Sequence, residues 1–66
     1  MKPSEIVDTT CQRLRAAGLT IKDACAAAGV SPVVVSRWRH GVAVPRRAGL
    51  VHFVRVSAQL IEEAKQ

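Results

Sequence analysis

Aromatic residues are scarce in this sequence, which contains one tryptophan, one phenylalanine and no tyrosine. A β-sandwich core depends on aromatic and β-branched side chains, so this scarcity argues against that fold. Alanine and valine supply much of the 48% hydrophobic content and suit closely packed helices. A chain of 66 residues buries one small core. We therefore expect an all-α protein of one domain, residues 1–66, whose function lies on its surface.

Acidic residues are missing from the stretch between Ala24 and Ile61, although it contains five arginines. These are Arg37, Arg39, Arg46, Arg47 and Arg55. The net charge is +5, and its segregation is typical of a surface that binds a polyanion. A solvated basic face that binds nothing has the same pattern, so charge alone leaves both interpretations open.

Groupings of residues that perform chemistry are also missing. Cys11 and Cys25 fall at apolar helical positions without the spacing of a zinc site, so we expect buried, reduced thiols. His40 and His52 have no partner ligand at metal spacing, and the sequence offers no nucleophile with a base and no phosphate loop. We therefore expect no metal, no cofactor, no small-molecule ligand and no enzymatic activity.

Long apolar runs are absent as well. A membrane span needs about 18 consecutive apolar residues, and neither such a run nor the apolar core of a signal peptide is present. Together with the reduced cysteines, this absence predicts a soluble, cytoplasmic protein of a bacterium or of a phage-infected host cell.

Local signals predict the first two helices. Ser4 can cap a first helix that ends at Gly18. The apolar face of this helix carries Val7, Cys11 and Leu14. Thr20 and Asp23 resemble a short-acid version of the capping box, which opens a second helix of roughly residues Ile21 to Ala28.

A sharp turn and a third helix follow. Gly29 can adopt the left-handed backbone conformation, and Ser31 with Pro32 can serve as the cap and first residue of a helix to about His40. The inward residues of this helix are Val35 and Trp38. Its outward residues are Val33, Ser36, Arg37 and His40.

The C-terminal third predicts one or two further helices. Pro45 suits the start of a fourth helix with an apolar side of Leu50, Val51 and Val54. Residues 50–56 are rich in β-branched side chains and would also pass as an edge strand, but no partner strand follows, so we favour a helix. Ser57 is expected to cap a fifth helix through Lys65, with an apolar stripe of Leu60, Ile61 and Ala64. The domain thus has four or five helices.

The segment from Leu19 to Gly41, LTIKDACAAAGVSPVVVSRWRHG, resembles the helix-turn-helix of the phage repressor and Cro family. The matched positions are Cys25, Gly29, Val30, Val35 and Trp38. The resemblance implies a lambda-repressor-like fold that binds double-stranded DNA as a homodimer through the third helix. Two departures stand out, because Ile21 replaces the glutamine of many members and Pro32 with Val33 replaces their outward polar pair.

The resemblance and the chemistry of the DNA major groove assign roles to individual residues. Arg37 matches the O6 and N7 atoms of guanine, Val33 a thymine methyl group and Ser36 a neighbouring base. The alternatives are a phosphate contact or a free surface charge for Arg37, and a core residue or an exposed residue without a binding role for Val33. The expected contacts to the DNA backbone are Ser31, Arg39, His40, Arg46 and Arg47. The expected dimer surface consists of Val51, Phe53, Val56, Leu60 and Ile61.

Three functions remain open at this stage. The first is a dimeric repressor of phage, prophage or plasmid type on a short palindromic operator. The second is an antitoxin that binds both an operator and a toxin. The third is a protein-interaction module that has kept a helix-turn-helix fold without DNA binding, which Ile21 and the Pro32-Val33 pair make conceivable.

Overall fold

Four helices follow one another in the computed structural model, which describes residues 1–65. They are α1 (Pro3–Ala16), α2 (Ile21–Ala28), α3 (Pro32–Arg39) and α4 (Arg47–Ala64). No strand occurs in this range, so the expected all-α fold is confirmed.

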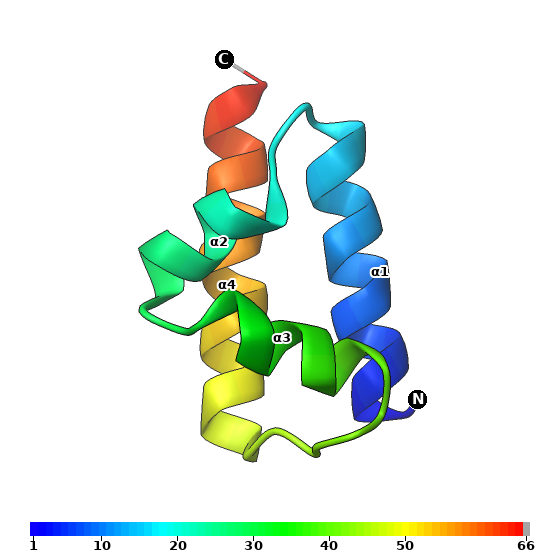
Figure 1. Ribbon diagram of the computed structural model, residues 1–66. Helices are drawn as coiled ribbons and strands as arrows, with labels where there is room; N and C mark the ends of the chain where they lie inside the picture. Colours follow the sequence, from blue (N-terminus) through cyan, green and yellow to red (C-terminus); the bar gives the residue numbers. More distant parts are fainter. Residues whose placement is uncertain (66) are drawn as a thin grey trace.

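The two long helices, α1 and α4, stand side by side, and the two short helices cross in front of them (Figure 1). Among the helix pairs, α2 contacts mainly α4, and α3 contacts mainly α1. The loop from α3 to α4 passes the end of the molecule where α1 begins, and the C-terminal end of α4 lies at the opposite end (Figure 1). The α3 helix is therefore held against α1 and α2, with its other side at the front.

All four helices contribute to one core. Its buried apolar members are Val7, Cys11, Leu14, Ala24, Cys25, Ala28, Val35, Trp38, Phe53 and Ile61. The predicted inward faces of α1 and α3 are thus confirmed. Within this core, the rings of Trp38 and Phe53 meet edge to face, with centroids 6.3 Å apart and planes at 79°. This arrangement is one that aromatic pairs prefer.

The turn from α2 to α3 forms as its residues predict. Gly29 ends α2 with a φ of +72°, in the left-handed region that glycine adopts without steric cost. The Oγ atom of Ser31 accepts a hydrogen bond of 3.2 Å from the Val33 N–H, and Pro32 is the first residue of α3. These local interactions fix where α3 begins.

A capping box opens α2, also as predicted. The Thr20 side chain accepts a 3.1 Å hydrogen bond from the Asp23 N–H, and the Asp23 carboxylate accepts a 3.0 Å bond from the Thr20 N–H. The bond from the Thr20 backbone, reinforced by its side chain, lowers the pKa of Asp23 below its ordinary value.

The start of α1 differs from the prediction. Ser4 is not the cap, because α1 begins at Pro3 with Lys2 as its N-cap and without a side-chain cap. The fixed φ of a proline at the first helical position is preorganised for a helix, which accounts for the earlier start. The Lys2 carbonyl accepts hydrogen bonds from the N–H groups of Glu5 and Ile6.

The C-terminal third is one helix, so the predicted fifth helix is wrong. Residues 50–56 form a helix and not an edge strand, as predicted from the sequence, and α4 continues through Ser57 to Ala64. Buried residues at Phe53, Ser57 and Ile61 recur every four positions, and this continuous stripe holds the helix together where the β-branched residues disfavour it. The α4 helix begins at Arg47, two residues after Pro45. Val51 is 37% exposed, because Phe53 occupies the inward side of this helix.

We predict that replacing Ser57 with alanine stabilises the protein. The Ser57 Oγ is buried and has no hydrogen-bond partner among residues 1–65. A buried unpaired hydroxyl costs about 1 to 3 kcal/mol, and alanine is the better helix former, so we expect a gain of about 1 kcal/mol in unfolding free energy. Thermal unfolding measures the gain against Ser36→Ala, an exposed α3 position where only helix propensity changes. A Ser57→Ala protein less stable than the parent contradicts the prediction.

Candidate nucleic-acid interface

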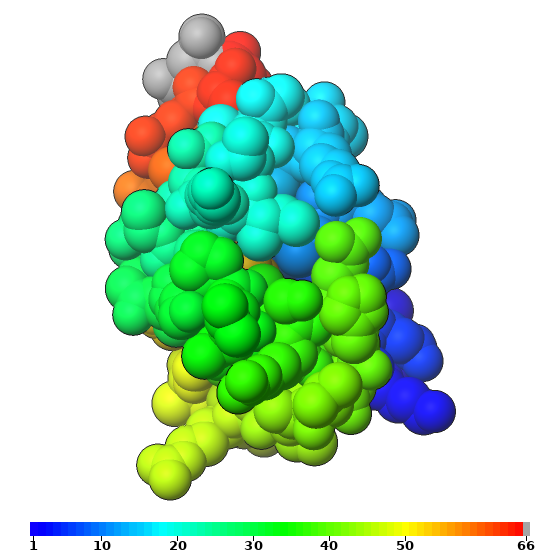
Figure 2. Space-filling view, in the orientation of Figure 1, coloured from blue at the N-terminus to red at the C-terminus, as the bar shows by residue number. Residues whose placement is uncertain are grey.

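One side of α3 is exposed and carries the residues that the sequence predicts to face outward. We call Val33, Ser36, Arg37 and His40 the α3 face, and all of them are exposed. Residues three, four and seven positions apart share one side of a helix, so these side chains form one surface. The space-filling view shows α3, in green, at the front of the molecule and uncovered by other helices (Figure 2). Their outward orientation is thus confirmed.

The opposite side of α3 makes this surface rigid. Val35 and Trp38 are 1% and 9% exposed, respectively, and belong to the core. The Ser31 cap holds the first turn, while the N–H groups of Val42 and Ala43 bond to the Arg37 carbonyl at 2.9 and 3.3 Å. Both ends of this short helix are therefore held in place, so the side chains of the α3 face start from a fixed backbone.

The charge of the α3 face is positive. Arg37 brings five N–H donors in a planar fork, and neither Asp nor Glu occurs in α3. Arg37 also has no ion-pair partner among residues 1–65. Ser36 and His40 add smaller hydrogen-bonding groups, and Val33 adds an apolar one, 59% exposed. This combination matches a partner rich in acceptor atoms with some apolar groups.

Further exposed arginines lie just beyond α3. Arg46 and Arg47 form the N-cap and first residue of α4, immediately after the loop that folds back onto the Arg37 carbonyl. Arg47 also lines a shallow hollow on α4 with Ala48, Val51, His52 and Arg55. Ser31, predicted to contact the DNA backbone, is exposed at the other end of α3. The predicted backbone contacts Ser31, His40, Arg46 and Arg47 are thus all at the surface.

Arg39 differs from these residues because it has a partner within the chain. Its Nε atom lies 2.7 Å from Oδ1 of Asp8 on α1, and its side chain is 25% exposed. Gln12 donates a hydrogen bond of 2.9 Å to the second carboxylate oxygen, Oδ2 of Asp8. Sequence reasoning missed Asp8, since a contact between residues 31 positions apart leaves no local signal.

The predicted dimer surface needs correction. Phe53 and Ile61 are 0% and 5% exposed, respectively, so they are core residues and not interface residues. In a chain with one tryptophan and one phenylalanine, the single small core takes up the largest side chains available. Val51, Val56 and Leu60 remain at least partly exposed. They belong to separate hollows, because Val51 lies with Arg55, whereas Val56 and Leu60 lie with Ala27, Gln59 and Glu63.

The cysteines and His52 are residue types that bind metals or act in catalysis in many proteins. In this structure, each of them contacts other parts of the chain. Cys11 and Cys25 are free and buried, and burial raises the pKa of each thiol above its ordinary value. His52 Nε2 lies 3.1 Å from the carbonyl oxygen of Ala28, the last residue of α2. Within residues 1–65, no three His, Cys, Asp or Glu side chains are grouped so that they hold a metal ion.

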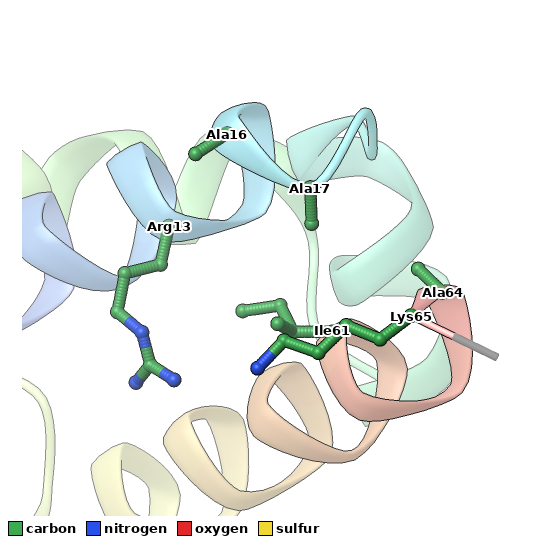
Figure 3. Close-up of a pocket in the computed structure, with 6 residues that line it drawn as sticks. All are labelled: Arg13, Ala16, Ala17, Ile61, Ala64 and Lys65. Atoms are coloured by element: carbon green, nitrogen blue, oxygen red, sulfur yellow. The ribbon is translucent and has the colours of Figure 1, made fainter.

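A second basic hollow lies between the ends of α1 and α4, and α3 does not contribute to it. Figure 3 shows the Arg13 side chain extending from α1 into the space between the two helices, with Ile61 and Lys65 on the α4 side. Lys65 also lies 3.8 Å from a carboxylate oxygen of Glu62. None of the α3 face residues lines this hollow, so Arg13 carries a positive charge away from the α3 face.

Comparisons with known proteins found no match to a family model, to a curated protein or to a solved structure. Among residues 1–65, no helix is long and apolar enough to cross a membrane.

Proposed function

We propose that this protein binds double-stranded DNA through the α3 face and regulates transcription as a homodimeric repressor. The observation that carries the proposal is the α3 face itself, a rigid, exposed and acid-free surface on a helix anchored by Trp38. The DNA major groove admits one α-helix, and its base edges present acceptors and methyl groups. A turn of three residues joins α2 to α3, so the pair supports the resemblance to lambda-repressor-like helix-turn-helix proteins.

Individual roles follow from where the side chains lie. Arg37 reads a guanine, with Ser36 and Val33 beside it on neighbouring bases. Ser31, His40, Arg46 and Arg47 contact the DNA backbone. The first group gives sequence preference, and the second gives affinity and register.

Pairing of two chains is part of the proposal. A helix of eight residues covers only a few base pairs, and two copies on a palindromic site supply the missing affinity and specificity. Of the residues predicted for the dimer surface, Val56 and Leu60 share one hollow and are the better candidates, since Phe53 and Ile61 are buried.

Exposed valines favour a second candidate function. Val33, Val42 and Val44, on α3 and in the loop after it, are 59%, 76% and 78% exposed, respectively. A partner protein would cover these apolar side chains, so a protein-interaction module or an antitoxin with a toxin partner is the alternative. Failure to select any sequence from random duplex DNA would favour this alternative.

The test begins with selection of bound sites from random duplex DNA, followed by a comparison of Arg37→Ala with Arg46→Ala. We expect Arg37→Ala to cost about 1 to 3 kcal/mol on the best site and to flatten discrimination at one base pair in each half-site. Arg46→Ala is expected to weaken all sequences alike and to reduce the salt dependence, because phosphates occur at every step. Unchanged base preference in the Arg37→Ala protein would show that Arg37 does not read the sequence.

A further inference from the structure

The Asp8–Arg39 ion pair lies at the boundary between α1 and the α3 face. Asp8 is on α1, and Arg39 is the last residue of α3, three positions after Ser36. Residues three apart are neighbours on a helix surface, so Arg39 borders the α3 face on the side where α1 packs. The Asp8 and Arg39 side chains are 39% and 25% exposed, respectively, which leaves both within reach of a bound ligand.

The geometry of this pair leaves part of the guanidinium free. Asp8 binds Arg39 through one oxygen and the Nε atom alone, and the other carboxylate oxygen accepts a hydrogen bond from Gln12. A carboxylate that fully engages an arginine forms two parallel bonds and occupies two of its nitrogens. Within residues 1–65, the two terminal nitrogens of Arg39 have no hydrogen-bond partner, so they remain available to an acceptor from outside the chain.

We propose that Asp8 is a positioning residue for DNA binding, which orients Arg39 so that its terminal nitrogens bind a DNA phosphate beside the α3 face. This inference rests on the proposed function. Asp8 carries a negative charge that by itself repels DNA. Asp8 favours DNA binding by orienting Arg39, because a guanidinium already held through Nε loses less conformational freedom when it binds a phosphate.

A double-mutant cycle in DNA affinity tests this role. The wild-type protein, Asp8→Ala, Arg39→Ala and the double variant are titrated on the selected site at one salt concentration. Ordering a free side chain at an interface costs enough to weaken binding by roughly 2- to 10-fold, and we expect that loss for Asp8→Ala. In the Arg39→Ala background, we expect Asp8→Ala to leave affinity unchanged or to raise it, since only the repelling charge is removed. A loss of affinity from Asp8→Ala that occurs only when Arg39 is present is a result that a purely structural role of Asp8 does not produce.

Two further variants separate orientation from charge and from folding. Asp8→Asn keeps an acceptor oxygen for Nε, so we expect it to retain the affinity that Asp8→Ala loses. Glu5→Ala removes an exposed acid one turn earlier on the same helix and is expected not to weaken binding. Thermal unfolding of every variant checks that the titrated protein is folded.

The possible outcomes are distinct. Tighter or unchanged binding by Asp8→Ala, or equal weakening with and without Arg39, overturns the positioning role and leaves the proposed function intact. A wild-type protein that binds no duplex DNA overturns the proposed function, and the positioning role with it.

Discussion

Replacing Trp38 with alanine is expected to unfold the protein or to destabilise it severely. Trp38 is 9% exposed, and its ring meets Phe53 edge to face within the one core that residues 1–65 form. Truncation of a buried tryptophan costs about 3 to 5 kcal/mol. Native domains have about 0.05 to 0.15 kcal/mol of stability per residue, which is about 3 to 10 kcal/mol for a chain of 66 residues, so the substitution removes much or all of the stability.

Circular dichroism and thermal unfolding measure the effect of Trp38→Ala. Val33→Ala is the matched control, because Val33 lies on the same helix with 59% of its surface exposed, and we expect its unfolding midpoint to stay close to that of the parent. A Trp38→Ala protein with an unchanged midpoint contradicts the core position of this side chain. If the Trp38→Ala protein is folded but less stable than the parent, the contribution of Trp38 to anchoring α3 is the difference in unfolding free energy between Trp38→Ala and Val33→Ala.

Features fixed by short-range chemistry were predictable from the sequence. Thr20 and Asp23 lie three residues apart, and Ser31 precedes Pro32, so each helix start is determined by a few neighbouring residues. Gly29 ends α2 in the left-handed conformation for the same local reason. The exposure of the α3 face also followed from helical spacing once Val35 and Trp38 were assigned inward.

Features that depend on contacts between distant segments were not predictable. Ser57 has the chemistry of a helix cap, but it lies inside α4 because the buried stripe of Phe53 and Ile61 continues across it. Arg39 has the chemistry of a phosphate contact, and only the packing of α1 on α3 brings Asp8 to its Nε atom. In both cases the local signal is correct for an isolated segment, and tertiary contact decides the outcome.

Raising the salt concentration from roughly 50 to 200 mM is expected to weaken DNA binding on the order of a hundredfold or more, if about five phosphates are neutralised by each dimer. The exposed arginines proposed to contact the DNA backbone support a number of this size, since Arg46 and Arg47 at the start of α4 supply four such contacts to a dimer. Each neutralised phosphate releases counterions, so the logarithm of the affinity falls linearly with the logarithm of the salt concentration. Titrations on the selected site at several salt concentrations give the slope.

Arginine variants locate the source of this slope. Arg47→Ala is expected to reduce its magnitude by nearly 1 for each chain, because one phosphate contact is lost. Arg13→Ala removes the same charge from an exposed residue in the hollow between the ends of α1 and α4, so we expect the slope to stay unchanged. Equal effects of the two substitutions would mean that DNA senses only the net charge of +5. Binding that does not depend on salt would rule out the exposed arginines as the source of DNA affinity. The exposed valines would then be the better candidates for the site that binds a partner.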